Sequence, residues 1–244
     1  MTGFNIQAAA PHTHDVAIEV ASRLLGGLKN RDVLDLPCGA GLMCRRLTEF
    51  GARVTGIDIE ANPNFLADPA CRVVHDLNKG IPLEDASFDL VMSIEGVEHL
   101  ENPSYFMREM ARVLRRDGVA ILSTPNVDSF RSRLSRLMRG HYKFFRPLDE
   151  GERVSGHLHP IDMVLVHGAA AKAGLRIVEI AVNEITDHRM FLKELLRPHL
   201  TRHLPKSMRG RVPFYGDVII YALVHAGGSR DPEARQAATR AGER

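Results

Sequence analysis

The sequence predicts an α/β fold in which a mainly parallel sheet carries helices on both faces. Two observations lead to this prediction. Short apolar runs of strand length alternate with segments of helical periodicity along the 244 residues. The first run, residues 33–35, ends in an acid and continues into a loop with two glycines, Gly39 and Gly41, before a segment that can form a helix. Glycine lets the backbone turn sharply and lets a ligand approach closely, so this stretch predicts a strand, a tight turn and a helix N-terminus.

The remaining elements follow in order. Gly26 and Gly27 mark the end of a first helix, and Pro103 and Gly118 mark the start and the end of a later one. The helices are predicted over residues 13–25, 42–47, 103–116 and 160–173. The strands are predicted over residues 33–35, 53–59, 71–76, 90–94, 119–123, 175–182 and 217–224.

Polar side chains stand at the ends of five of these strands, namely Asp35, Asp58, Asp76, Glu95 and Asn126. The carboxyl ends of parallel strands meet at one edge of a sheet, and open α/β sheets bind ligands beyond that edge. An acid at the end of the second strand, about 20 residues past a glycine loop, is where a Rossmann-type fold holds ribose hydroxyls. The sequence therefore predicts a ligand site that contains a ribose group.

The runs DLPCGAG (residues 35–41) and VTGIDIE (54–60) resemble the first two motifs of the class I S-adenosylmethionine (SAM) dependent methyltransferases, of the type 11 or 23 kind. The segment 81–89, IPLEDASFD, and the segment 123–126, STPN, are similar to two further motifs of that family. A dinucleotide-binding fingerprint fails here, because position 44 is Cys where that fingerprint has a third glycine. The resemblance implies a three-layer αβα, Rossmann-like fold with a seven-stranded sheet whose last strand is antiparallel.

The resemblance also implies SAM as the cofactor. By position, Asp76 takes the role of contacting the adenine amino group. Pro37 replaces a glycine of the family pattern, so we expect a loop with one fewer backbone donor. The implied cofactor-binding residues are Asp35, Leu36, Pro37, Gly39, Gly41, Asp58, Ile59, Asp76, Leu77, Ser93 and Glu95.

The segment after the fourth predicted strand carries the pattern E-x-x-E-H, with Glu95, Glu98 and His99. On one helical turn these side chains share a face and could bind a divalent cation or form a general base. The pattern resembles two metal-using branches of the family, the ubiquinone-pathway O-methyltransferases and the small-RNA 3′-terminal 2′-O-methyltransferases. That resemblance would make all three residues metal ligands, with His157 or His159 as a fourth. The run EHL, residues 98–100, is also common in family members with no known metal, so the alternative is a catalytic His99 that faces the acceptor. The candidate catalytic residues are His99, Glu98 and Asn126.

Two segments are basic. Residues 128–146 hold six Lys or Arg and one acid, and residues 188–211 hold seven and one, although the net charge is only +2. This segregation points to an anionic partner. Drawn as a helix, the first segment places Phe130, Leu134, Leu137 and Met138 on one stripe, which favours either an interfacial contact with an anionic membrane or a helix packed on the sheet rim.

The composition, with 44% hydrophobic and 25% charged residues, is that of a globular protein with one domain. We expect that domain over residues 1–226, with a basic insert at 127–159, and a disordered polar tail at 227–244. No apolar run of about 18 residues and no signal peptide is evident. The expectation is a cytoplasmic protein, peripheral at most, with three reduced cysteines, Cys38, Cys44 and Cys71.

The function predicted from these features is methyl transfer from SAM to a small or lipid-linked acceptor, with oxygen favoured as the acceptor atom and carbon or nitrogen left open. One alternative is RNA 2′-O-methylation, which the basic segments favour and the aromatic content of 6% does not. Another is a non-catalytic SAM-binding regulatory module. The sequence does not identify the acceptor or the oligomeric state.

Overall fold

The computed structural model describes residues 9–145, 157–183 and 215–234, and the chain forms one seven-stranded sheet in the order β3-β2-β1-β4-β5-β7-β6. The strands are β1 (Asp32–Asp35), β2 (Arg53–Asp58), β3 (Arg72–Val74), β4 (Phe88–Ser93), β5 (Leu114–Pro125), β6 (Leu175–Val182) and β7 (Val218–His225). Only β7 runs against its neighbours, pairing antiparallel with β5 and β6. The predicted fold class, including the antiparallel last strand, is confirmed.

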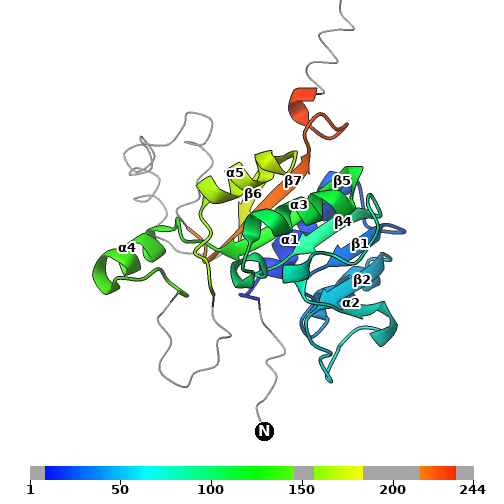
Figure 1. The fold of residues 1–244 in the computed structure, drawn as a ribbon, viewed down its shortest axis with the longest axis horizontal. Helices are drawn as coiled ribbons and strands as arrows, with labels where there is room; N and C mark the ends of the chain where they lie inside the picture. Colours follow the sequence, from blue (N-terminus) through cyan, green and yellow to red (C-terminus); the bar gives the residue numbers. More distant parts are fainter. Residues whose placement is uncertain (1–8, 146–156, 184–214, 235–244) are drawn as a thin grey trace, which may run out of the picture.

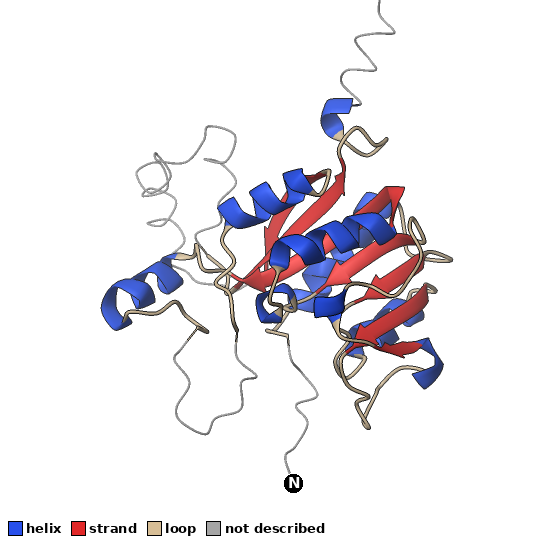
Figure 2. Cartoon of the chain, in the orientation of Figure 1, coloured by secondary structure: helices blue, strands red, loops and turns tan. Residues whose placement is uncertain are grey.

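Helices cover both faces of this sheet, as Figures 1 and 2 show. The α-helices are α1 (Thr13–Leu25), α2 (Leu42–Glu49), α3 (Pro103–Val113), α4 (Phe130–Arg139) and α5 (Met163–Lys172). Three single-turn 3₁₀ helices, η1 (Pro69–Cys71), η2 (Leu77–Lys79) and η3 (Val97–His99), lie in the connections. Helices α3 and α5 pack on one face and α1 and α2 on the other, each with its own buried apolar cluster. Helix α4 belongs to neither cluster and projects from the body (Figure 1).

Local signals in the sequence explain where the helices begin and end. Gly26 ends α1 in the left-handed conformation, with φ of 72°. Asn102 caps α3 by accepting the Tyr105 amide at 2.9 Å, and Pro103 occupies the first turn. Asp162 caps α5 in the same way. Each apolar helix face then meets the sheet, which is the usual source of helix stability in a globular protein.

Two predicted boundaries are wrong. The helix predicted to end near Arg116 stops at Val113, and β5 begins at once, because Leu114 pairs with Phe88 of β4. Arg115 continues this strand and donates to Asp89 of β4 at 2.8 Å, so its charge is paired where the two strands begin.

The tail predicted to be disordered from residue 227 is ordered as far as residue 234. Asp231 is buried and accepts the Gly227 amide at 2.8 Å, and the Ser229 hydroxyl donates to Asp117 at 2.6 Å. Residues 235–244 lie outside the described residues, as do residues 146–156 of the predicted insert and the whole of the second basic segment, 188–211. No helix in the described ranges is long and apolar enough to cross a membrane.

Candidate active site

The carboxyl ends of β1, β2 and β4 meet at one edge of the sheet, and the strand order reverses between β1 and β4. This switch point is where open α/β sheets bind ligands. The loop after β1 folds across it. The Leu36 amide donates to the Met92 carbonyl of β4 at 2.9 Å, and the Cys38 amide donates to the Ile57 carbonyl of β2 at 2.8 Å. Pro37 lies between them, with a cis peptide bond, so the loop is held by both neighbours of β1.

Asp58, the last residue of β2, binds this loop through a hydrogen bond. Its Oδ2 accepts the Gly39 amide at 2.7 Å, and its Oδ1 accepts the amide of Ile59 at 2.8 Å. Each carboxylate oxygen has two lone pairs, so each retains one for a ligand hydroxyl. The Ile59 side chain beside it is exposed. Two free lone pairs next to an apolar side chain fit a ribose and its base.

Asp35, the last residue of β1, is only 1% exposed and lines a hollow together with Pro37 and Gly39. Burial raises the pKa of this carboxyl to about 7, and the charge of Asp58 acts in the same direction, whereas a hydrogen bond from the Cys44 thiol opposes it. That thiol donates to Oδ2 at 3.2 Å. A buried carboxylate is stabilised by a cation, so this hollow favours a positively charged ligand.

Gly41 lies in the loop that lines the hollow, between Ala40 and Leu42, and Asp76 follows β3. Gly41 has φ of 76°, and a Cβ built there would lie 2.5 Å from the ring of Phe65, so the residue must be glycine. Asp76 accepts the Asn78 amide at 3.0 Å and so caps η2, while Leu77 is buried beneath that turn. Asp76 therefore lies at the end of β3, as predicted.

The segment after β4 packs directly against the loop after β1. A Cβ built on Gly96 would lie 2.1 Å from Cδ of Pro37 and 3.1 Å from the hydroxyl of Ser93. The Ser93 side chain is buried at the end of β4. Any larger residue at position 96 would push these two loops apart, so the loop after β1 and the residues that follow β4 pack together as one unit.

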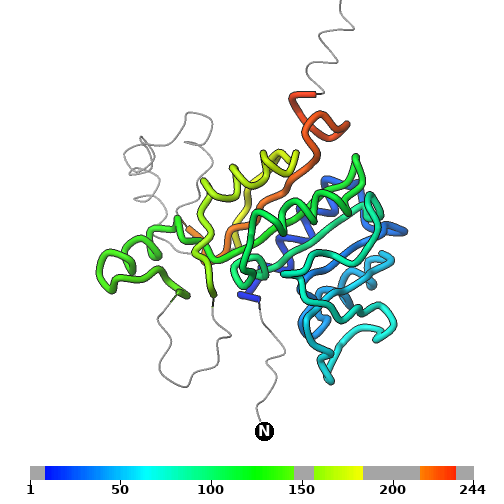
Figure 3. The backbone as a smooth tube through the Cα atoms, in the orientation of Figure 1, coloured from blue at the N-terminus to red at the C-terminus, as the bar shows by residue number. Residues whose placement is uncertain are grey.

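The described chain begins with residues 9–12, drawn in dark blue in Figure 3, and part of this segment lines the hollow. The Ala10 amide donates to Oε2 of Glu95 at 2.7 Å, and Glu95 has φ of 48°, in the left-handed region. Ala9 and His14 line the hollow with Asp35. Burial lowers the pKa of His14 to about 4, with a further contribution from Arg46. No spacing in the sequence singles out His14, because its position in the hollow depends on the packing of α1 against the loop.

Glu98, His99 and His157 form a compact cluster beside this unit. Their ligand atoms lie within 4.8 Å of one another, and the two imidazole rings meet edge to face at 4.8 Å. Glu98 is fully buried, and burial raises its pKa to about 8. Although Thr124 of β5 lies beside it, neither carboxylate oxygen meets hydrogen-bond geometry with a partner in the described part of the chain. The ring of Phe145 packs on His157 at 5.1 Å.

A short extended segment brings His157 to η3 from far along the chain. The amides of Leu158 and His159 both donate to the carbonyl of Glu98, at 2.8 and 3.1 Å. Nε2 of His157 lies 3.9 Å from the Glu98 carboxylate. Burial lowers the pKa of His157, and a neighbouring His99 adds to this effect, so its imidazole is neutral at neutral pH.

Of the predicted metal set Glu95, Glu98 and His99, the structure brings together Glu98 and His99 but not Glu95. The left-handed backbone at Glu95 turns its carboxylate to Ala10, and His157 takes the third place in the cluster. Of the two candidates for a further ligand, the cluster includes His157 and not His159. Asn126 lies at the end of β5, but its amide nitrogen donates to the Tyr215 carbonyl at 2.9 Å. This bond ties β5 to the start of β7, and a catalytic role for Asn126 stays a prediction.

Comparison with known proteins agrees with the resemblance that the loop motifs carry. The family model described as a methyltransferase domain matches residues 34–122, from β1 to β5. The ubiquinone biosynthesis O-methyltransferase of Bradyrhizobium diazoefficiens is 36% identical over 113 residues, which is 42% of this chain and 42% of that protein. The chain thus aligns with less than half the length of this relative.

Solved structures show the same fold over most of the chain. An S-adenosylmethionine dependent methyltransferase from Mesorhizobium loti superposes with a TM-score of 0.53 at 17% identity, covering 84% of this chain and 95% of that one. The 1,6-didemethyltoxoflavin-N1-methyltransferase of Burkholderia thailandensis, solved with bound S-adenosylhomocysteine, gives 0.55 at 14% identity, covering 88% and 80%. At these identities the likeness concerns the fold, and the residues of the site carry the argument about function.

Proposed function

We propose that this chain, whose residues 34–122 match the methyltransferase domain family, transfers a methyl group from SAM to a hydroxyl oxygen of a small or lipid-linked acceptor. The observation that carries the proposal is the placement of three strand-end acids around a clamped loop, next to a cluster of two imidazoles and a buried carboxyl. The acids are Asp35, Asp58 and Asp76. The cluster is Glu98, His99 and His157.

The residues around the loop fit SAM group by group. Asp58 offers two lone pairs to the ribose hydroxyls, and the exposed side chain of Ile59 offers an apolar surface to the adenine. Asp35 places a buried carboxylate where a cationic ligand is stabilised. SAM carries both an ammonium and a sulfonium group, so its charge suits this position.

Bound SAM supplies a methyl carbon on a positively charged sulfur, so a bond from the acceptor oxygen to that carbon forms as the carbon–sulfur bond breaks and its electron pair stays on sulfur. The chain must hold the acceptor in line and remove its proton. His157 is suited to that second task, because burial keeps its imidazole neutral near neutral pH, and the ring of His99 lies beside it at 4.8 Å. Glu98, with a pKa of about 8, is protonated there and lies 3.9 Å from Nε2 of His157.

The same cluster supports a second mechanism on the same fold. Two imidazoles and a carboxylate with unpaired oxygens, within 4.8 Å of one another, are a suitable ligand set for a divalent cation. Such a cation would polarise the acceptor oxygen and lower its pKa. Glu98 would have to lose its proton to bind the cation, so cation affinity would increase with pH up to about 8.

The experiment that tests the function is a mass-shift screen with methyl-labelled SAM. Separate pools contain small hydroxylated aromatics, a lipid extract and RNA with free 3′ ends. A labelled product in the first or second pool supports the proposal, and labelling of RNA alone would replace it by the RNA alternative. Binding of S-adenosylhomocysteine without any labelled product would indicate the non-catalytic module.

A chelator separates the two mechanisms once a substrate is known. With a general base, activity is indifferent to EDTA and shows a limb in its pH–rate profile, and His99→Gln or His157→Gln lowers kcat about 10²- to 10⁴-fold. With a metal, activity is lost in EDTA and returns with Mg²⁺ or a transition metal. His159→Gln is the matched control, because His159 joins the same segment without entering the cluster. Unchanged kcat in both histidine variants would make the cluster structural.

A further inference from the structure

Helix α4 joins the rest of the chain through its polar face. Ser132 is 1% exposed, and its hydroxyl accepts the Lys143 amide at 3.2 Å. At about 100° per residue, Arg136 lies on the same side of the helix as Ser132. The apolar stripe lies on the opposite side, where Leu137 is 83% and Met138 74% exposed. The prediction that this stripe packs against the rim of the sheet is therefore wrong.

A hollow of about 270 Å³ adjoins the attached face of α4. Its volume is close to the lower end of the range for small-molecule sites, about 300 Å³. It shares no lining residue with the hollow beside Asp35, so the two are separate sites. The lining residues come from the connection after β5, from α4 and the turn that follows it, and from the start of α5. They are Val127, Asp128, Arg133, Arg136, Tyr142 and Asp162.

The two acids of this hollow are already compensated by the protein. Oδ1 of Asp128 accepts a hydrogen bond from Arg133 at 2.9 Å, and Oδ2 accepts the Met163 amide at 3.1 Å. Asp162 caps α5, and its Oδ1 accepts the Leu165 amide at 2.8 Å. A carboxylate at a helix N-terminus is stabilised by the helix dipole. The negative charges of the hollow are therefore balanced without an added cation.

Arg136 is the charged group of the hollow that has no opposite charge beside it. One N–H of its guanidinium donates to the Gly140 carbonyl, and the central carbon lies 5.6 Å from the centre of the Tyr142 ring. The side chain is exposed and forms no ion pair with any described residue. A guanidinium carries five N–H donors in a planar fork that matches a carboxylate or a phosphate. The hollow thus offers a cation beside an aromatic ring, which fits an anionic group on an apolar or aromatic body.

A buried donor also lies close to the hollow. Tyr221 of β7 is 0% exposed, and its hydroxyl has no hydrogen-bond partner among the described residues. Burial raises the pKa of this hydroxyl, and the charges of Asp128 and Asp162 add to the effect, so it keeps its proton. Both acids line the hollow, so a protonated hydroxyl without a partner lies near it. Such a donor favours an occupant that carries acceptor atoms.

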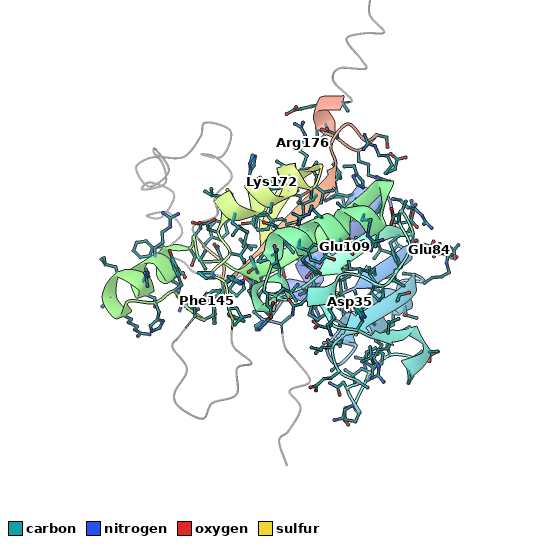
Figure 4. The ribbon with its side chains drawn as sticks, viewed as in Figure 1. Asp35, Glu84, Glu109, Phe145, Lys172 and Arg176 are labelled. Carbon is teal, nitrogen blue, oxygen red and sulfur yellow. The ribbon has the colours of Figure 1, made fainter. Side chains whose placement is uncertain are left out.

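The hollow is close to the candidate catalytic cluster along two parts of the chain. The Tyr142 carbonyl accepts the Phe145 amide at 3.0 Å, and the Phe145 ring packs on His157 at 5.1 Å (Phe145 is labelled in Figure 4). Asp162 follows His157 by five residues. Three residues of chain span at most about 11 Å, so Tyr142 and Phe145 are no further apart than that. A small acceptor held beside Tyr142 can therefore extend to the cluster.

We propose that this hollow binds the methyl acceptor by an anionic group, a carboxylate or a phosphate, which pairs with Arg136 while the body of the acceptor packs against Tyr142. Arg136 then selects anionic acceptors over neutral ones of the same shape. The role of the bound molecule as an acceptor rests on the proposed function. The binding of an anion does not, since it requires no turnover.

NMR titration of the full chain, saturated with S-adenosylhomocysteine, tests the binding. The probes are phenylacetate, phenyl phosphate and the neutral phenylacetamide, which share one ring and differ in the group attached to it. Both anions should bind, and the amide should bind at least about tenfold more weakly. The anion that binds more tightly shows whether a carboxylate or a phosphate fits the hollow better.

Three variants locate the site. Arg136→Gln should weaken the binding of both anions about 10- to 100-fold, because a hydrogen bond between charged groups is lost. Arg136→Lys keeps the charge without the planar fork, so it should recover part of that loss. Arg139→Gln is the matched control, because Arg139 is an exposed arginine of the same helix that does not line the hollow. The melting temperature and the affinity for S-adenosylhomocysteine should be unchanged in all three variants, which shows that the fold is intact.

Three binding results would overturn the proposal. The first is that none of the three probes binds to the wild type. The second is that the amide binds as tightly as the anions. The third is that Arg136→Gln binds the anions as the wild type does.

Turnover separates this inference from the proposed function. With an anionic acceptor from the mass-shift screen, Arg136→Gln should raise KM and leave kcat nearly unchanged. Neutral methylated products, with a KM that Arg136→Gln leaves unchanged, would contradict this inference and leave the proposed function intact. Anion binding that requires Arg136, without any methylated product, would contradict only the proposed function.

Discussion

The Asp58 carboxylate accepts the Gly39 amide at 2.7 Å and thereby joins the end of β2 to the loop after β1. The same carboxylate is the candidate acceptor for both ribose hydroxyls. Asp58→Ala should therefore weaken S-adenosylhomocysteine binding by about 2–4 kcal/mol, or about 30- to 1000-fold. Calorimetric titration measures this loss. Glu60→Ala, which removes an exposed acid two residues further on, should leave the affinity unchanged. Equal affinities in wild type and Asp58→Ala would refute the ribose assignment.

The raised pKa of Asp35 predicts pH-dependent cofactor affinity. A cationic ligand stabilises the carboxylate, so binding to the protonated form must release a proton. Affinity for SAM should be constant above about pH 7 and fall by up to about tenfold per unit below it. His14, in the same hollow, has a pKa of about 4 and is neutral over this window.

Titrations across this pH range, in two buffers of different ionisation enthalpy, give both the affinity and the number of protons released. Asp35→Asn should bind more weakly above pH 7 and lose the slope, because its amide does not titrate. A slope that persists unchanged in Asp35→Asn would assign it to another group, and Glu95, whose pKa burial also raises, would be the next candidate.

Much of the fold and of the cofactor site follows from local sequence. The glycine loop, the acids at three strand ends and the capping residues act within a few positions of one another, and the structure has α1 at residues 13–25 as predicted. The boundary between α3 and β5 at Leu114 could not be predicted from local sequence. The pairing of Leu114 with Phe88 and the hydrogen bond from Arg115 to Asp89 join distant parts of the chain.

The cluster of Glu98, His99 and His157 is also hard to predict, because it too joins distant parts of the chain. His157 reaches His99 through backbone bonds to Glu98, and Glu95 leaves the set because its backbone is left-handed. Spacing along a helix, which gave the original set, holds only where a regular helix forms, and η3 is a single 3₁₀ turn. The stripe on α4 was visible in the sequence, but whether it faces the core or solvent depends on tertiary packing.

We expect glycine to be required at position 96 because neighbouring side chains leave no room for a Cβ, and not because of its backbone conformation. Its φ of −121° is open to any residue, whereas an added Cβ would lie 2.1 Å from Cδ of Pro37. Gly96→Ala should displace the loop and lower both the melting temperature and the affinity for S-adenosylhomocysteine. An overpacked site of this kind typically costs about 1–3 kcal/mol.

Gly168, inside α5, is the matched control, since a Cβ there meets nothing within 4 Å. Gly168→Ala should leave cofactor affinity unchanged and stabilise the protein by about 0.5–1 kcal/mol, because alanine favours a helix interior. Thermal unfolding and calorimetry measure both effects. If Gly96→Ala behaved like Gly168→Ala, the rigid contact between the two loops would not matter for binding.

Glu98 should make the protein less stable as the pH rises. Its pKa in the folded chain, about 8, exceeds the usual value of 4.5, so the folded state binds the proton more tightly than the unfolded state does. The contribution of Glu98 to stability is therefore fully present below about pH 4.5 and declines up to about pH 8, by a few kcal/mol at most. Glu98→Gln, which stays neutral, should remove this decline, whereas Glu101→Gln, at an exposed position, should keep it. Melting temperatures of the three proteins between about pH 5 and pH 8, in the presence of EDTA, give the comparison. Parallel curves for wild type and Glu98→Gln would mean that Glu98 is ionised and compensated in the folded protein.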